Sequence, residues 1–317
     1  MTPTPAPPAT MRAYVGTPDG PERRRVPDPQ PAPDQALVQV EAFSINRGEL
    51  GLFARRPEGW RPGQDVAGRV LVPAVDGSGP AAGTRVVALV DFGGWAERVA
   101  APVERLARLP ETVQAERAAG CGVAGLTSLR ALRRGDGLLG ARVLITGASG
   151  GVGTFAVQLA AAGGAEVTAL AGTRRSVDFD ALGADHVIGS LDDADGDFDL
   201  VLESVGGETL LAALRHTAPR GHLVLIGSSS GDPAPITISS FRPHARQTVH
   251  PFWVHGSGEP VDQDLADLAR LTARGLLDPV VGWCGCWDHL DQAMRALRER
   301  RVAGKAILSV DHADEPR

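Results

Sequence analysis

A glycine-rich turn between a strand pattern and a helix pattern constrains this chain more than any other feature. Residues 142–146 form a short β-branched apolar run, four glycines crowd the turn that follows, and an Ala-, Val- and Leu-rich helix pattern continues through Gln158. This order is typical of a dinucleotide-binding fold, because glycine lets the backbone approach a pyrophosphate and the free amides of the helix start favour its charge. The alternative is an ordinary connection between a strand and a helix.

Individual positions of the turn have separate expected roles. We expect Gly150 to admit the pyrophosphate and Gly153 to let the helix pack closely against the strand. The residues expected to hold the cofactor here are Ala148, Ser149, Gly150, Gly151, Val152 and Gly153.

The rest of the chain divides into two textures. Short strand patterns at 11–15, 36–43, 65–75, 84–90 and 95–100 predict a compact, mainly antiparallel β domain. From about residue 112, strands and helices alternate, which predicts a parallel sheet covered on both faces. The expected elements there are strands at 142–146, 166–171, 186–188, 199–203 and 222–226, helices reaching 182 and spanning 208–215, 261–274 and 288–300, a closing strand at 306–310, and a strand at 248–254 that Pro251 confines to an edge or irregular position. The predicted fold class is α/β.

Composition excludes several classes of protein. The chain has 317 residues, enough for two domains, and its 43% hydrophobic content fits a globular protein. The net charge of −6 argues against a nucleic-acid partner, and the arginines at 23–25 are expected on a solvated surface. Three cysteines cannot form a disulfide framework, and no leader or membrane-spanning pattern occurs, so we expect a cytoplasmic protein that does not enter a membrane. Residues 1–10 are expected to be a disordered tail.

The residues after the second strand of the parallel sheet indicate the cofactor form. In an NAD-type fold this strand ends in an acidic residue that binds the ribose hydroxyls. Here the chain reads Gly172, Thr173, Arg174, Arg175, and the acid is missing. Two guanidinium groups favour a 2′-phosphate, so the sequence predicts NADPH. The alternative is that one or both arginines begin the next helix in water.

A series of short motifs runs nearly from end to end. These are Ser44-Ile45-Asn46-Arg47-Gly48-Glu49-Leu50, Pro62-Gly63-Gln64-Asp65-Val66-Ala67-Gly68, Gly93-Gly94-Trp95-Ala96-Glu97, Val123-Ala124-Gly125-Leu126-Thr127, the turn at 147–153, Leu182-Gly183-Ala184-Asp185, Glu203-Ser204-Val205-Gly206-Gly207 and Val302-Ala303-Gly304-Lys305. In this order they resemble the zinc-independent quinone oxidoreductase branch of the medium-chain dehydrogenase/reductase superfamily. With Ala148 in place of the first fingerprint glycine, the turn is similar to the quinone-reductase variant.

The resemblance implies an architecture. It implies a GroES-like catalytic domain from residues 11–111 and 277–317, a Rossmann NADPH-binding domain from 112–276, and an active site in the cleft. It also implies a homodimer formed through the edge of the dinucleotide-binding domain.

The resemblance also bears on metal chemistry. Zinc relatives carry ligands where Asn46, Gln64 and Val123 fall, and none of those ligating side chains is kept. Cys121 lies two residues from the expected position and is expected to be a small buried residue. We expect Cys284 and Cys286 to be neighbours on one strand face, and we expect no metal site.

The expected activity is metal-free hydride transfer from NADPH to quinones or α,β-unsaturated carbonyl compounds, because their charge delocalises when hydride is added. Asn46, Gln64 and Asp65 are the candidate catalytic residues; the alternatives are a turn residue for Asn46 and a surface or capping carboxylate for Asp65. Asn46 is the candidate for orienting the substrate or the nicotinamide ribose. The resemblance places Thr127 at the nicotinamide end, although Thr127 could be packing alone. The remaining candidate cofactor residues are Ser204, Val205, Gly206, Gly227, Ser228 and Lys305, for which turn chemistry or a position beside the last strand is the alternative.

Two other functions remain open. The chain has no obvious acid–base side chain at the candidate site, since its only tyrosine is Tyr14 and the family's tyrosine position after the Asn46 motif holds Leu52 and Phe53. A non-catalytic NADPH-binding sensor or interaction module of the same fold is therefore an alternative. An activity like that of alcohol dehydrogenases is a third.

Overall fold

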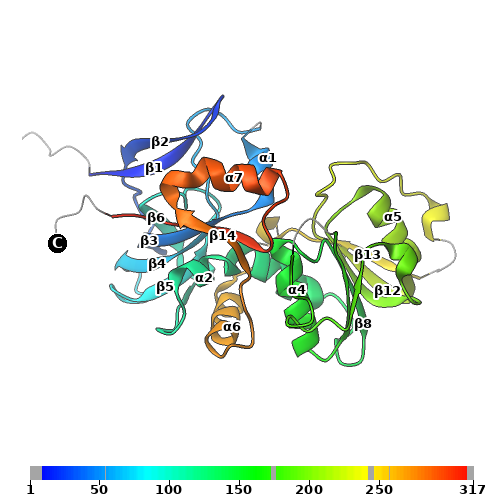
Figure 1. The fold of residues 1–317 in the computed structure, drawn as a ribbon. Coiled ribbons are helices and arrows are strands. Elements are labelled where there is room, and N and C mark those ends of the chain that lie inside the picture. The colour runs from blue at the N-terminus through cyan, green and yellow to red at the C-terminus, as the bar shows by residue number, and fades with distance from the viewer. Residues whose placement is uncertain (1–8, 54, 173–175, 242–245, 257, 313–317) are drawn as a thin grey trace, which may run out of the picture.

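The computed structural model describes residues 9–53, 55–172, 176–241, 246–256 and 258–312. It has two lobes, one built around a mainly antiparallel sheet from both ends of the chain and one around a parallel sheet from its middle (Figure 1). The predicted α/β fold class with two sheets of different kinds is confirmed. The domain boundaries at 111/112 and 276/277 stay a prediction.

The antiparallel lobe has a seven-stranded sheet. Its strands, in spatial order, are β14 (Val281–Cys286), β15 (Lys305–Ser309), β3 (Gln35–Ile45), β4 (Asp65–Val72), β5 (Arg85–Leu89) and β7 (Leu106–Arg108), with β6 (Arg98–Pro102) paired to β3. Only β14 and β15 run parallel. The long strand β3 buries Val38 and Val40 and leaves Gln39 partly exposed, as its alternating pattern predicts.

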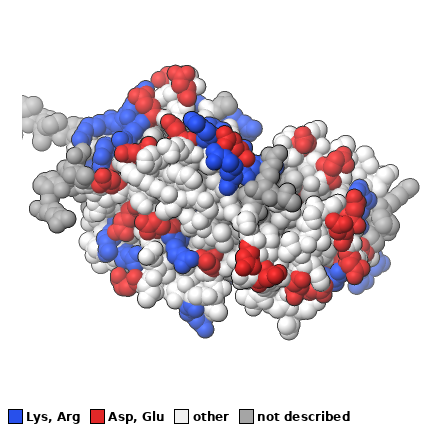
Figure 2. Space-filling view, in the orientation of Figure 1, with Lys and Arg blue, Asp and Glu red and all other residues white. Residues whose placement is uncertain are grey.

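A hairpin of β1 (Thr10–Thr17) and β2 (Gly20–Pro27) forms a separate two-stranded sheet, and Tyr14 N of β1 donates to the Trp95 carbonyl of the same lobe at 2.9 Å. Strand β2 has no predicted counterpart, because its Glu22 and the arginines at 23–25 give no apolar period. Those three arginines are exposed, as predicted. On the face drawn in Figure 2, basic and acidic side chains are interspersed.

The second lobe has a six-stranded sheet in which all strands are parallel. Their order is β10 (His186–Ile188), β9 (Glu166–Leu170), β8 (Arg142–Thr146), β11 (Phe198–Glu203), β12 (Thr217–Leu225) and β13 (Thr248–Pro251). Counted along the chain from β8, this is the doubly wound order 3-2-1-4-5-6, whose direction reverses between β8 and β11. Ligands of such sheets bind where the carboxyl ends of these two strands diverge. Strand β13 lies at an edge, as Pro251 predicts.

Helices pack around and between the two sheets. They are α1 (Arg47–Leu52), α2 (Ala115–Ala119), the π-helical turn η2 (Cys121–Gly125), α3 (Leu126–Leu132), α4 (Gly151–Ala162), α5 (Gly207–Arg215), α6 (Asp262–Ala273) and α7 (Leu290–Arg298), with 3₁₀ turns η1 (Val103–Arg105), η3 (Leu191–Asp193), η4 (Ile238–Phe241), η5 (Val254–Gly256) and η6 (Trp287–His289). One apolar core includes Ala42 and Leu89 of the antiparallel sheet together with Val143 and Phe155 of the parallel lobe. The two lobes therefore share buried contacts.

The helix predicted to reach residue 182 is wrong for the part of it that the structure describes. Residues 179–183 form turns, and Gly183 has a φ of +89°. The Asp178 carboxylate accepts a hydrogen bond from the Ala181 amide at 3.1 Å, a local bond that competes with helix formation. Within the described ranges, none of the helices is both long and apolar enough to cross a membrane.

Candidate active site

The glycine turn lies at the point where the parallel sheet changes direction. Gly147 has a φ of +59°, and Gly150 is the N-cap of α4. A Cβ at Gly153 would lie 2.6 Å from the Ala148 carbonyl oxygen, so the close approach of helix and turn requires glycine there. The first turn of α4 leaves backbone amides without intrahelical acceptors, and they point towards the carboxyl ends of the strands. The turn therefore fits the pyrophosphate of a dinucleotide.

The turns after β8, β11 and β12 meet beside it. A Cβ at Gly147 would lie 2.6 Å from Ser204 Oγ, and one at Gly206 would lie 2.7 Å from Ser228 Oγ. Ser229 N donates to the Ser204 carbonyl at 3.0 Å. The structure thus brings most of the predicted cofactor residues of this lobe to one edge of the sheet.

Glu203 fixes the turn that follows β11. Its carboxylate accepts from Val205 N at 2.8 Å, from Gly206 N at 3.1 Å and from Thr146 Oγ1 at 3.1 Å. Burial raises the pKa of Glu203. The three donors hold the turn in a fixed shape without a contribution from any ligand.

The other predicted cofactor residues have mixed surroundings. Thr127 in α3, Ala148 and Ser149 are buried, Val152 is half-buried, and Gly172 is exposed at the end of β9. Thr173, Arg174 and Arg175 lie outside the described residues.

The Asp65 carboxylate is the centre of a polar cluster between the lobes. Asp65 is fully buried, which excludes the alternative of a surface carboxylate. Its Oδ2 accepts from Ser44 Oγ at 2.5 Å and from Asn46 Nδ2 at 2.9 Å, and its Oδ1 accepts from Val123 N at 2.7 Å. Lys305 Nζ lies 3.2 Å from Oδ2. The Asp65 carboxylate therefore has four hydrogen-bond donors around it.

Lys305 connects this cluster to the dinucleotide turn. Its Nζ donates to Asn46 Oδ1 at 2.6 Å, and its side chain is 3% exposed. A Cβ at Gly151 would lie 2.9 Å from Lys305 Cδ, and Gly304 N donates to the Ser149 carbonyl at 3.0 Å. The lysine stem therefore crosses the start of α4, while its ammonium group lies against Asn46 and Asp65.

Asn46 and Glu49 are held together at the start of α1. Glu49 Oε2 accepts from Asn46 N at 2.8 Å and from Asn46 Nδ2 at 3.2 Å, and Oε1 accepts from Gly63 N at 3.1 Å. Burial and, second, the neighbouring Asp65 carboxylate raise the pKa of Glu49 to about 8. Because the Asn46 amide bonds Glu49, Asp65 and Lys305 at once, its orientation is fixed.

A kink in η2 makes room for the Asp65 carboxylate. Gly122 has φ −56° and ψ −105°, outside the helical region, and this turns Val123 N towards Asp65. A Cβ at Gly122 would lie only 2.3 Å from Asp65 Oδ1. The glycine and the carboxylate are therefore mutually dependent.

Gly122→Ala is expected to displace the Asp65 carboxylate and to destabilise the fold by roughly 1–3 kcal/mol, the usual cost of overpacking. Urea denaturation and steady-state turnover check this. Gly48→Ala is the matched control, because nothing lies within 4 Å of its new methyl group; it should leave turnover unchanged. Equal behaviour of the two variants would contradict the contact.

Gln64 faces the imidazole of His255, which comes from the parallel lobe. Gln64 Nε2 lies 2.8 Å from His255 Nε2, and Arg105 Nη2 lies 3.1 Å from His255 Nδ1. The His255 side chain is 7% exposed. Burial and, second, the Arg105 guanidinium lower the pKa of His255.

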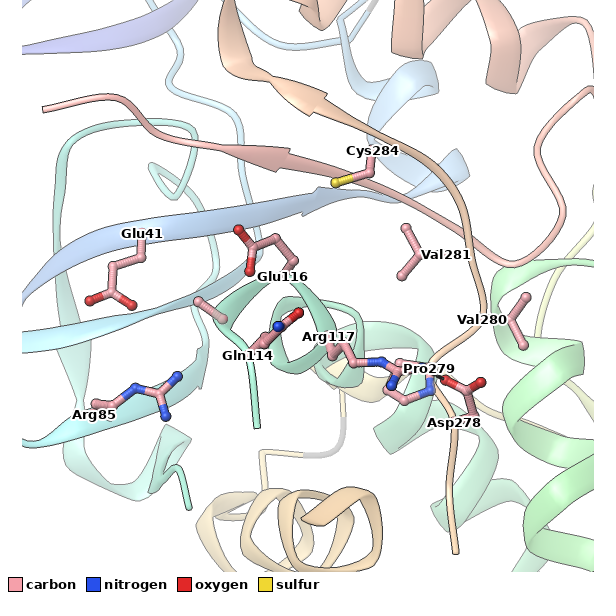
Figure 3. Close-up of a pocket in the computed structure, with 11 residues that line it drawn as sticks. Glu41, Arg85, Gln114, Glu116, Arg117, Asp278, Pro279, Val280, Val281 and Cys284 are labelled. Carbon is pink, nitrogen blue, oxygen red and sulfur yellow. Dashed lines mark hydrogen bonds and ion pairs between the residues drawn. The ribbon is translucent and has the colours of Figure 1, made fainter. Parts of the chain in front are cut away.

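Neither of two surface cavities among the described residues is lined by Asn46 or Asp65. The larger, of about 980 Å³, lies between α2 and β14 (Figure 3). Charged side chains at its wall have partners, since Arg117 bonds Asp278 and Glu116 accepts from Ser309 Oγ. The second, of about 590 Å³, is lined by Gly227 and Phe252 at the carboxyl ends of β12 and β13. Only the second adjoins a predicted cofactor residue.

The donors present at the cluster do not fit a zinc ion. Asn46 offers an amide in place of a thiolate or imidazole, and its oxygen and that of Asp65 already bind the Lys305 ammonium group. Across the described ranges, no three His, Cys, Asp or Glu side chains form a group that could hold a metal ion. Cys121 is buried, which raises the pKa of its thiol to about 12. The residues of this cluster therefore do not form a zinc site.

Tyr14 lies away from the cluster, in the core of the antiparallel lobe. Its hydroxyl donates to the Trp287 carbonyl at 2.8 Å, and burial raises its pKa to about 12. The only tyrosine of the chain thus has a structural partner.

Sequence reasoning missed Glu49, Arg105 and His255 as site residues. Glu49 had a signal, because Asn46 followed three positions later by glutamate is a capping pattern at a helix start. No local pattern singles out His255, which meets Gln64 across 191 positions of sequence.

Comparison with known proteins shows similarity to proteins described as dehydrogenases and as quinone oxidoreductases. A family model described as "Zinc-binding dehydrogenase" matches residues 182–308. A zinc-type alcohol dehydrogenase-like protein of Schizosaccharomyces pombe is 31% identical over 320 residues, covering 89% of this chain and 90% of that protein. A chloroplast envelope quinone oxidoreductase homolog of Arabidopsis thaliana is 37% identical over 192 residues, covering 56% of this chain and 58% of that protein.

Solved structures extend the similarity to the whole fold. An alcohol dehydrogenase superfamily protein from Novosphingobium aromaticivorans superposes with a TM-score of 0.83 at 26% identity, over 96% of this chain and all of the other. Both lobes and their arrangement are therefore shared with these relatives.

Proposed function

The chain belongs to the zinc-binding dehydrogenase family, within the medium-chain dehydrogenase/reductase superfamily and its quinone oxidoreductase branch, and from this we propose that it is a metal-free, NADPH-dependent reductase of quinones or α,β-unsaturated carbonyl compounds. The fold of this family implies a nicotinamide dinucleotide cofactor. The chain spans 58% of the length of the plant quinone oxidoreductase homolog that it matches, so substrate and activity are proposals.

The contact of Lys305 with Asn46 and Asp65 is the observation that carries the metal-free part. The buried Lys305 ammonium group donates hydrogen bonds to Asn46 Oδ1 at 2.6 Å and to Asp65 Oδ2 at 3.2 Å. Without a Lewis acid, a substrate carbonyl must be polarised by hydrogen-bond donors, which suffices when hydride addition produces a delocalised enolate or quinol. The bound cofactor supplies the hydride.

The chain's own residues orient the reactants. Asn46 is proposed to position the substrate or the nicotinamide ribose, because Glu49, Asp65 and Lys305 fix its amide. Gln64, which is half-buried, is proposed to face the substrate. Asp65 is fully buried and is therefore proposed to act by holding Asn46 and Lys305.

Arg174→Ala is expected to raise the KM for NADPH much more than the KM for NADH, because the arginine is proposed to bind the 2′-phosphate. Initial rates with each cofactor at saturating quinone check this. Arg175→Ala in parallel tells whether both guanidinium groups contribute. An equal rise of the two KM values would reject a role for Arg174 in cofactor choice.

Steady-state NADPH oxidation tests the proposed activity. We expect turnover with 1,4-benzoquinone, a naphthoquinone or 2-cyclohexenone. Tight NADPH binding without turnover on all three would favour the non-catalytic sensor or interaction module. Alcohol oxidation that requires metal in the purified protein would favour the dehydrogenase alternative.

The proposed assembly is a homodimer in the cytoplasm. Support for the dimer is the family resemblance together with β13, which lies at the edge of the parallel sheet and is followed by Trp253, 69% exposed. Sedimentation velocity is expected to give twice the mass of one chain, and a single-chain mass would reject it. The cytoplasmic location rests on the few cysteines.

A further inference from the structure

A line of hydrogen-bonding groups leads from the protein surface to Gln64. It begins at Asp91, whose side chain is 64% exposed and accepts from Arg105 Nη1 at 2.9 Å. Arg105 Nε donates to the Leu89 carbonyl at 3.1 Å, so the guanidinium plane is fixed. Its Nη2 lies 3.1 Å from His255 Nδ1, and His255 Nε2 lies 2.8 Å from Gln64.

These groups come from both lobes. Arg105 ends η1, and Gln64 directly precedes β4, both in the antiparallel lobe. His255 lies in η5, just after the edge strand β13 of the parallel sheet. Trp253 packs near the imidazole, with ring centroids 5.9 Å apart. The His255 contacts with Arg105 and Gln64 therefore span the boundary between the two lobes.

The surroundings of His255 select one tautomer. A guanidinium group has only donors, so His255 Nδ1 must accept the hydrogen bond from Arg105. Because Nδ1 accepts this bond, the ring is neutral and its single proton is on Nε2. Burial and the Arg105 guanidinium, which lower the pKa of His255, favour this neutral form. Nε2 faces Gln64, whose amide satisfies this proton by presenting Oε1 after a half-turn about its terminal bond. The more distant Asp91 Oδ1, 3.4 Å from Nδ1, competes less well for a proton there.

We propose that His255 is a positioning residue which, held by Arg105, fixes the Gln64 amide with its NH₂ group towards the substrate oxygen. Gln64 then donates a hydrogen bond to the substrate oxygen, where negative charge develops during hydride addition. A Lewis acid has the same role in a metal enzyme. The kinetic consequence of this inference rests on the proposed reductase function, whereas the expected tautomer of His255 does not. Arg105, His255 and Gln64 form hydrogen bonds without transferring a proton, so their action needs no further reactant.

The tautomer is measured without turnover. Long-range ¹H–¹⁵N spectra of protein labelled in its histidines report which ring nitrogen carries the proton, and His255→Phe identifies the signal. We expect the Nε2–H form in the wild type and a mixture of tautomers in Arg105→Met. An Nδ1–H form in the wild type would overturn the proposal.

Kinetics test the action through Gln64. His255→Phe keeps the ring and is expected to lower kcat by about tenfold, since misplacing a catalytic group by about 1 Å costs up to a hundredfold. The KM for NADPH should not change, and His255→Gln, which restores a donor near the place of Nε2, should recover most of the turnover. His216→Phe, the same change at a half-buried histidine after α5, is the control.

A double-mutant cycle separates this role from general packing. In a Gln64→Leu background, His255→Phe should have almost no further effect, because the group through which it acts is gone. Additive losses would overturn the proposal. If the wild type turns over no quinone or enone, the proposed function fails. The tautomer measurement alone then tests the arrangement of Arg105, His255 and Gln64.

Discussion

Lys305→Met is expected to lower the free energy of unfolding by about 3–5 kcal/mol, because it leaves a fully buried carboxylate without its cation. It should also lower kcat, since the Asn46 amide loses the donor to its oxygen. Urea denaturation measures the first effect and NADPH oxidation the second.

The control for this prediction is the double variant Asp65→Asn, Lys305→Met. Without either charge, the site keeps hydrogen bonds to Ser44 and Val123 and should be more stable than Lys305→Met alone. A Lys305→Met protein as stable as the wild type would mean that the ammonium group is not part of a buried pair.

The unfolding free energy is expected to depend on pH through Glu49, whose pKa is raised from 4.5 to about 8. The folded protein favours the neutral carboxyl, so its stabilising contribution is complete below about pH 4.5 and is lost as the pH rises to about 8. Between these values, each rise of one pH unit should lower the unfolding free energy of the wild type by about 1.4 kcal/mol relative to that of Glu49→Gln.

Urea titrations of both proteins at several pH values from 5 to 9 check this expectation. Taking the difference between them cancels the other titrating groups that the two proteins share. Parallel pH profiles would contradict it, because Glu49 would then titrate alike in the folded and unfolded chain.

Features coded by adjacent residues could be predicted from the sequence. The strand β8, the glycine turn and α4 follow one another directly, so pattern and turn chemistry identify them together. Pro251 limited β13 to an edge, where the structure has it. Strand β2 could not be predicted in this way, because an exposed strand rich in arginine has no apolar period.

The chemistry of the site depends on contacts that no local pattern records. Lys305 and Asn46 are 259 positions apart, and the sequence offered Lys305 either a cofactor phosphate or a place beside the last strand. The fold brings its ammonium group to Asn46 because β15 pairs with β3, which places Ala306 opposite Ile45. Asp65, a candidate catalytic residue in the sequence, is the buried centre of the cluster.

Turnover by metal-depleted protein tests the central claim most directly. NADPH oxidation with 1,4-benzoquinone would be followed after dialysis against a chelator, with residual zinc measured in the same sample, and again after zinc is added back. We predict the same kcat in all three samples, because hydrogen-bond donors polarise the substrate. Activity that disappears with the metal and returns with zinc would contradict the account.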